Sequence, residues 1–160
     1  MTFVSPSKGR MGFEEMMEDI IQYIKGLSTS SYKIIIGSDS MVKNDTCFIT
    51  AVIVHRLGKG ARYYYHKRLQ RKIKSLRQKV FYETALSLEV GCLVHKYFAD
   101  HGFDDLFEDL DVEIHIDVGV HGETKNLIRE VVGMVTGSGF KAKIKPDAYG
   151  ASSVADKHTK

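Results

Sequence analysis

Apolar and polar residues follow two different periods along the chain, and each change of period predicts a new element. In residues 13–25 the apolar side chains recur every three or four positions with acids between them, which predicts an amphipathic helix that Gly26 ends. Residues 32–38 and 47–56 are short and rich in β-branched side chains, which favours strands. The turn-forming residues 43–45 between them predict a hairpin.

The residues that follow add one strand to this meander and then alternate helices with strands. The expected elements are a strand at 61–69, a helix at 76–99, a strand at 111–118, a helix at 124–136, a strand at 140–144 and a short last helix capped by Ser152 or Ser153. This order indicates an α/β fold with a mixed five-stranded sheet and helices packed on it. We expect a single domain over residues 1–160, in which residues 1–31 form an N-terminal extension with one helix.

The composition is that of an ordinary globular protein. The 160 residues are 43% hydrophobic and 27% charged, which is enough for one sizeable core. No apolar run is long enough for a membrane helix, and residues 1–13 lack the hydrophobic stretch of a secretory signal. Cys47 and Cys92 lie in apolar runs without a metal-binding or redox spacing. We therefore expect a cytoplasmic protein with reduced cysteines.

The net charge of +3 hides a strong segregation of charge. Residues 59–82, the basic tract, contain nine basic side chains and no acid, and three tyrosines stand within it at positions 63–65. Lys and Arg gain affinity for nucleic acids from counterion release, and aromatic rings can stack on bases. A solvated helix face is the alternative interpretation of the same charges. The nucleic-acid contacts that we predict are Arg68, Arg71, Lys72, Lys74, Arg77 and Lys79.

Residues 97–122 reverse the sign, with eight acids and no Lys or Arg. Pairing of this acidic stretch with the basic tract of another subunit is a further hypothesis, that of an interaction protein whose oligomer loosens as salt rises. The sequence leaves the oligomeric state open.

Two aspartates occupy matching places in predicted strands. Asp39 follows the apolar residues 34–38, where the strand leaves the core, and Asp117 has the same place in the strand at 111–118. If these strands are parallel neighbours, their carboxyl ends bring the two side chains to one edge of the sheet. Open α/β sheets tend to bind their ligands at that edge.

Two further acids complete a candidate cluster. Glu83 stands in the apolar stripe of the helix at 76–99 and so points toward the sheet, where an unpaired charge is costly. Asp156, near the start of the last helix, could close the cluster from the other side. The order of the four acids along the predicted elements is what makes each of them a candidate, since a single acid at such a place is usually a turn, cap or salt-bridge residue.

A cluster of carboxylates suits Mg²⁺ or Mn²⁺, hard cations that take oxygen ligands and leave water in place for a substrate phosphate. Two such ions can activate a water on one side of a phosphodiester and stabilise the leaving oxygen on the other. No nucleophilic side chain is then required, which agrees with a chain that has no glycine-rich phosphate loop and no nucleophile-elbow motif. The predicted metal ligands and catalytic residues are Asp39, Glu83, Asp117 and Asp156.

The predicted elements and their acids resemble the ribonuclease H-like fold and its acidic site. The acids stand in I-I-I-G-S-D-S (Asp39), V-F-Y-E-T-A-L (Glu83), I-H-I-D-V-G (Asp117) and S-S-V-A-D-K-H (Asp156). More narrowly, G-S-D-S, G-E-T-K-N-L-I and K-P-D-A-Y-G-A-S-S-V-A-D-K-H-T-K look like the bacterial YkuK-type family of ribonuclease H-like proteins, over residues 33–160. The resemblance implies the fold and a metal-dependent nuclease site more firmly than it implies a substrate.

The resemblance also implies a role for each acid. Asp39 would bridge both metals, Glu83 would be the acid of the first helix after the meander, and Asp117 the acid of the fourth strand. Asp156 would be the last acid, on the second metal. The chain departs from ribonucleases H proper in the additional helix before its first strand.

Auxiliary candidates stand near these acids in the sequence. Ser40 follows the first aspartate, where ribonucleases H proper commonly have Gly, and could orient that aspartate by hydrogen bonding. Asp147 in K-P-D-A-Y competes for the place of the last acid. His158 could shuttle a proton or orient the attacking water. Lys125, at the start of a predicted helix, could contact a phosphate.

Two hypotheses of function follow from these observations. The first is a nuclease dependent on Mg²⁺ or Mn²⁺ that hydrolyses phosphodiester bonds of RNA, an RNA–DNA hybrid or structured DNA by a two-metal mechanism, with the basic tract holding the substrate. The second is a non-catalytic nucleic-acid-binding module with the same fold. It predicts salt-dependent binding that survives the loss of the acids. Both expect nucleic acid, and no membrane, as the partner.

Overall fold

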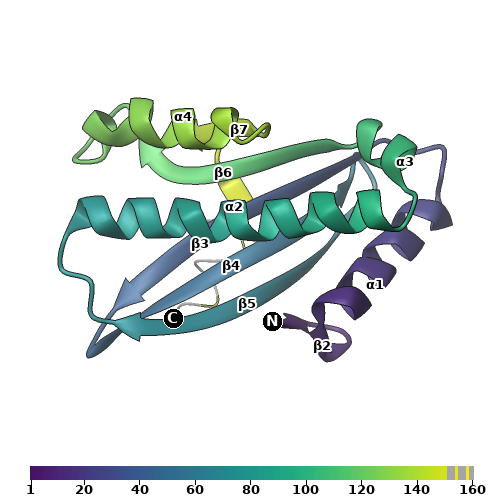
Figure 1. Ribbon diagram of the computed structural model, residues 1–160, viewed down its shortest axis with the longest axis horizontal. Coiled ribbons are helices and arrows are strands. Elements are labelled where there is room, and N and C mark those ends of the chain that lie inside the picture. The colour runs from purple at the N-terminus through teal and green to yellow at the C-terminus, as the bar shows by residue number, and fades with distance from the viewer. Residues whose placement is uncertain (151–153, 155–157, 159–160) are drawn as a thin grey trace.

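The computed structural model describes residues 1–150, 154 and 158, and these form one mixed sheet of seven strands with helices packed on it (Figure 1). The strands are β1 (Thr2–Ser5), β2 (Gly9–Gly12), β3 (Tyr32–Val42), β4 (Asp45–Arg56), β5 (Ala61–Arg71), β6 (Asp111–Gly119) and β7 (Lys141–Lys145). The helices within the described residues are α1 (Phe13–Gly26), α2 (Leu76–Asp100), α3 (Asp104–Glu108), the 3-10 turn η1 (Lys125–Leu127) and α4 (Ile128–Gly137). The strands lie side by side in the order β2-β1-β5-β4-β3-β6-β7.

The mixed α/β architecture confirms the predicted fold class, but the sheet has two more strands than the five expected. β3, β4 and β5 form the predicted antiparallel meander, β6 is parallel to β3, and β7 is parallel to β6. β1 and β2 form an additional hairpin, attached to β5 where Val4 lies opposite Tyr65. Both strands are only four residues long, and the G-R-M-G sequence of β2 lacks the β-branched side chains that favour a strand.

The helices cover one face of the sheet and bury the larger part of the core. Ile34 and Ile36 of β3, with Val52 and Val54 of β4, are fully buried there against residues of α1, α2 and α4. Figure 1 shows α2 running along the sheet between α4 and α1. None of the described helices has both the length and the apolar character needed to cross a bilayer.

The opposite face, called the C-terminal face below, carries a smaller apolar cluster. Its buried members are Ile35, Ile49, Ala51, Ile53 and Val154. Val154 comes from the segment after β7 and packs on the strands. His158 lies on the same face, with its ring stacked on Tyr65 at a centroid distance of 3.9 Å. β3 is therefore a central strand that is buried on both faces, which explains its continuous apolar sequence.

A buried polar chain fixes the start of the C-terminal segment on this face. The backbone N–H of Gly150 donates to Nδ1 of His115 over 2.9 Å, and Nε2 of the same ring lies 3.0 Å from Oε1 of Glu113. Because Nδ1 accepts, Nε2 carries the proton and donates to Glu113. Burial lowers the pKa of His115, which keeps the ring neutral. Nζ of Lys33, 3.1 Å from Oε2 of Glu113, completes the chain.

Gly150→Ala should destabilise the protein, because the site has no room for a methyl group. An added Cβ would lie 2.7 Å from Cγ2 of the buried Ile35 and 3.2 Å from Nδ1 of His115. Overpacking of this kind costs about 1–3 kcal/mol, which urea denaturation followed by circular dichroism would measure. Gly133→Ala in α4 is the matched control, since no atom lies within 4 Å of its Cβ position. Helix propensity predicts that the free energy of unfolding of the control rises by up to about 1 kcal/mol. Equal stability of the two variants would contradict the close packing at Gly150.

Candidate functional site

Three of the four predicted carboxylates converge between two strands and a helix. Asp39 of β3, Glu83 of α2 and Asp117 of β6 each place one carboxylate oxygen within 4.8 Å of the others. Asp39 and Glu83 are buried, whereas the side chain of Asp117 is 27% exposed. The cluster is therefore enclosed by protein at two of its members and accessible to solvent at the third.

The parallel pairing of β3 with β6 puts the two aspartates next to each other. The ladder between these strands ends with Gly37 opposite His115. Asp39 and Asp117 each stand two residues beyond that last pair, so their side chains leave the same face of neighbouring strands. The sequence prediction depended on this parallel neighbourhood.

Asp39 itself lies inside its strand, so the prediction that it ends the strand is wrong. β3 continues to Val42, and Asp39 is paired with Ile49 of β4. The reason is that β4 stays in register along the whole of β3, whereas β6 leaves the ladder after Gly37. Asp39 thus loses a neighbouring strand on one side, which makes space for other carboxylates, while β4 holds its backbone on the other side.

Glu83 reaches the aspartates from the helical layer. Its side chain points from α2 to β3, where the hydroxyl of Ser40 donates to Oε2 of Glu83 over 2.5 Å. One turn further along α2, Ser87 is hydrogen-bonded to Ser38 at 2.7 Å. These small side chains let the helix approach the strand closely. At this short separation, the hydroxyl of Ser40 can reach Glu83, and its hydrogen bond fixes the orientation of the carboxyl group.

The pKa of Glu83 is raised to about 8, mainly because its carboxyl group is buried. The hydrogen bond from Ser40 and the charge of Lys79 oppose this shift, while repulsion by Asp39 and Asp117 adds to it. Without a cation, Glu83 is therefore protonated at neutral pH. The proton removes one of the three negative charges from the cluster.

Lys145 brings a positive charge to the same place, and sequence reasoning missed it. β7 runs parallel to β6 and sets Lys145 opposite Gly119, so that Nζ lies 2.6 Å from Oδ1 of Asp117. This hydrogen bond is the main cause of the raised pKa of Lys145, and the negative charges of the cluster add to it. Lys145 therefore stays charged. Its place just before Pro146, at the end of the last predicted strand, was the available signal, but the sequence does not reveal the register of two parallel strands.

The other predicted acids and auxiliary residues have different places. Asp156 lies outside the described residues. Asp147 is exposed in the turn after β7 and is not a member of the cluster. Lys125 is exposed at the start of η1. His158 lies on the C-terminal face, where its Nε2 is 3.2 Å from the hydroxyl of Tyr63.

The basic tract forms most of β5, the connection that follows and the first turns of α2. Ser75 caps this helix by accepting from the backbone N–H of Gln78. Arg71, Lys72 and Lys74 are exposed on the connection and its approach. The remaining predicted contacts have acidic neighbours within the chain: Arg68 lies 3.5 Å from Glu89, Arg77 lies 2.6 Å from Glu130, and Lys79 acts on Glu83.

Comparisons with known proteins cover almost the whole chain. A family model described as Ribonuclease H-like matches residues 15–160. The uncharacterized protein YkuK of Bacillus subtilis (strain 168) is 39% identical over 170 aligned residues, which span 99% of this chain and 96% of YkuK. No solved structure matches the chain. The family match includes all three elements that bear the clustered carboxylates, and the resemblance seen in the sequence is confirmed: the chain belongs to the ribonuclease H-like family.

Proposed function

We propose that this protein is a nuclease dependent on Mg²⁺ or Mn²⁺ that hydrolyses phosphodiester bonds of RNA, an RNA–DNA hybrid or structured DNA. The observation that carries the proposal is the convergence of Asp39, Glu83 and Asp117, whose carboxylate oxygens lie within 4.8 Å of one another. Membership of the ribonuclease H-like family supports it, since proteins with this fold often use divalent metals and bind nucleic acid.

The donor set fits a hard divalent cation. Each of the three side chains offers an oxygen atom, the ligand type that Mg²⁺ and Mn²⁺ prefer, and neither thiol nor imidazole belongs to the cluster of described residues. Carboxylates gathered at this distance repel one another, and the raised pKa of Glu83 is partly a result of that repulsion. A divalent cation would relieve it.

Each clustered residue has a role in this proposal. Asp39 and Asp117 are the ligands from the sheet, and Glu83 is the ligand from the helix, held in place by Ser40. Two bound ions would supply an activated water and stabilise the leaving oxygen. The exposed side of the cluster at Asp117 is where a substrate phosphate would enter.

Asp156 is the fourth ligand that we propose, with the exposed Asp147 as its competitor. Asp156 stands in the sequence between Val154 and His158, and both of these described residues lie on the C-terminal face. Asp39 belongs to that face as well, because it is paired with Ile49 of the same apolar cluster. Arg71, Lys72 and Lys74, together with Lys125, are the proposed contacts to substrate phosphates. His158 is a candidate proton carrier.

Asp39→Asn and Asp117→Asn should each reduce metal-dependent cleavage by more than about a hundredfold, because loss of an outer partner alone typically costs about 10–100-fold. Cleavage of labelled RNA, hybrid and branched DNA measures the activity, and calorimetry should show weaker Mn²⁺ binding. Asp104→Asn, which removes an exposed charge on α3, is the control and should act like the wild type. Cleavage at the wild-type rate by both Asp39→Asn and Asp117→Asn would contradict the proposal.

Metal binding should release a proton from Glu83. Because the pKa of Glu83 is about 8 without a cation, a metal that binds at neutral pH must displace that proton. The affinity for Mn²⁺ should therefore rise about tenfold per pH unit up to about pH 8 and level off above it. Calorimetry at several pH values measures this slope, and Glu83→Gln should flatten it. An unchanged slope in that variant would assign the proton to another group.

The raised pKa of Glu83 also contributes to the free energy of unfolding of the metal-free protein. The folded state keeps the proton of Glu83 up to about pH 8, whereas a carboxyl group with the ordinary value of 4.5 releases it in the unfolded state. This contribution is fully present below about pH 4.5 and is lost as the pH rises through about 8. Urea denaturation at pH 6 and pH 8.5 should accordingly show a smaller loss of stability for Glu83→Gln than for the wild type.

Lys145 favours a second candidate function, a non-catalytic nucleic-acid-binding module. Its ammonium group lies 2.6 Å from Asp117 and already supplies a positive charge to the cluster. In that case Mn²⁺ would not bind at millimolar concentrations, and Asp39→Asn would keep the wild-type affinity for nucleic acid. Affinity would instead fall steeply with salt, and it would fall after exchange of Arg71, Lys72 and Lys74 for Gln. Filter binding with and without Mn²⁺ distinguishes the two functions.

A further inference from the structure

Rows of side chains cross the C-terminal face from strand to strand. Residues directly opposite each other in an antiparallel ladder point to the same face of the sheet. Two neighbouring rows on this face run across β3, β4 and β5. They are Met41, Cys47 and Leu69 in one row, and Asp39, Ile49 and Lys67 in the next. An apolar row therefore lies directly beside the row that begins at the carboxylate cluster.

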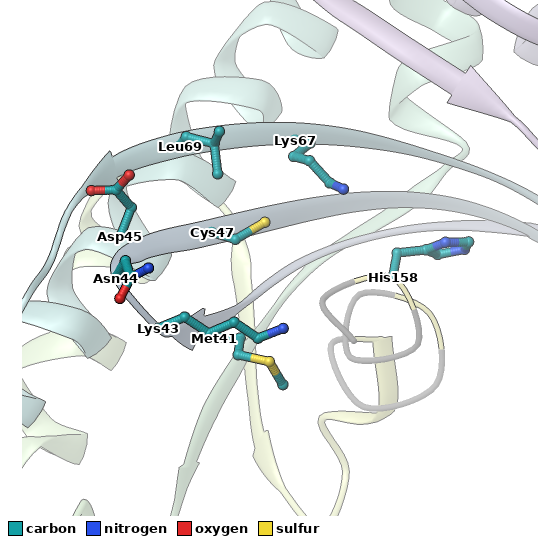
Figure 2. A pocket seen from close by; sticks show the side chains of 8 residues that line it. All are labelled: Met41, Lys43, Asn44, Asp45, Cys47, Lys67, Leu69 and His158. Atoms are coloured by element: carbon teal, nitrogen blue, oxygen red, sulfur yellow. The ribbon is translucent and has the colours of Figure 1, made fainter.

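A pocket of about 390 Å³ lies over the apolar row (Figure 2). Its polar lining consists of Lys43, Asn44, Asp45, Lys67 and His158. Figure 2 shows the side chains of Lys43 and Lys67 extending toward the end of the pocket where His158 lies, with Asp45 at the other end. The volume falls in the lower part of the range of small-molecule sites, about 300–1,000 Å³.

The lining combines an apolar floor with two ammonium groups. Leu69 is 66% exposed, and it continues across the strands into Cys47 and Met41 rather than standing alone. An apolar surface of this kind packs against the flat face of a base, and Lys43 and Lys67 offer positive charge to its phosphates. Asn44, from the turn between β3 and β4, and Asp45, the first residue of β4, bring a donor and acceptors for the polar edge of the base. The chemistry of the pocket is that of a nucleotide site.

The pocket lies beside the carboxylate cluster on the same face of the sheet. Lys67 lines the pocket and stands in the same row as Asp39, two strands away, which is about 10 Å at the usual spacing of strands. Met41, at its floor, comes two residues after Asp39 and points to the same face. A nucleic acid with one phosphate at the cluster thus has a neighbouring nucleotide within reach of the pocket.

We propose that this pocket receives one unpaired nucleotide beside the phosphate that is cleaved, and that the preferred substrate is single-stranded at that place. The inference rests on the proposed nuclease function and narrows its substrate class. In a duplex the faces of each base are covered by the neighbouring base pairs, so the apolar floor accepts only a base that has left the stack. The apolar floor and the lysines do not distinguish bases, and the contacts of Asn44 and Asp45 to the base edge are exposed to water, so the preference for particular bases is weak.

Oligonucleotide binding in EDTA tests the pocket separately from catalysis. The probes are a single strand with one fluorescent adenine analogue, whose emission reports stacking, and a blunt duplex of the same sequence. Leu69→Ala should weaken binding of the single strand about tenfold and that of the duplex less than about twofold, because only the unstacked base loses its apolar contact. Lys67→Gln should weaken single-strand binding and lower its salt dependence. Leu57→Ala, exposed in the turn between β4 and β5, and Lys96→Gln, exposed on α2 outside the basic tract, are the matched controls and should bind like the wild type.

Two results would contradict the proposed role of the pocket. One is that Leu69→Ala binds the single strand as tightly as the wild type does, and the other is that the wild type prefers the blunt duplex. Failure of the nuclease function gives a different pattern. In that case Leu69→Ala still weakens single-strand binding, but the wild type cleaves nothing when Mn²⁺ is added. In the converse pattern, the wild type cleaves its substrate and Leu69→Ala binds the single strand like the wild type. That result would support the nuclease function and contradict the nucleotide pocket.

Discussion

Repulsion between carboxylates is the constraint on which the rest of this structure depends. Asp39, Glu83 and Asp117 come from three elements, and each element is held by contacts that do not involve the cluster. β4 pairs with β3 along its full length, the serine contacts tie α2 to β3, and the ladder between β3 and β6 ends just before the two aspartates. The charge that remains is reduced by the proton on Glu83 and by Lys145. The framework is therefore built to keep like charges together in the absence of a cation.

The two faces of the sheet contribute different chemistry to the same place. The helical face brings Glu83 and encloses it, whereas the C-terminal face carries Asp39, the apolar row and the lysines of the pocket. The two faces meet where β6 leaves β3, because the end of this ladder lets Glu83 of the helical layer reach Asp39 and Asp117 of the other face. Open α/β sheets generally bind ligands where strand connections diverge in this way, and the three clustered carboxylates of this mixed sheet lie at such a place.

Local pattern was enough to predict much of this arrangement. Apolar runs identified β3 and β4, and the alternation of apolar and polar residues identified β6. The acid within the apolar stripe of α2 identified Glu83, because side-chain period and burial leave a direct trace in sequence. What the sequence did not reveal depends on register and on contacts between distant segments. β1 is only four residues long and β2 lacks strand-forming residues. Lys145 meets Asp117 only through the pairing of β7, and the row of Met41, Cys47 and Leu69 exists only once three strands are aligned.

The contact of Gly150 with Ile35 has a consequence for how the molecule folds. The two residues belong to segments far apart in the sequence, and they are packed so closely that a single methyl group between them would clash. Contacts of large sequence separation form slowly, because the entropy of a long loop must be lost before the contact gives any stabilisation. The meander of β3, β4 and β5 needs only short connections and forms without this step. We therefore expect the C-terminal face to close after the meander has formed, so that the packing around Ile35 is completed on a sheet that already exists.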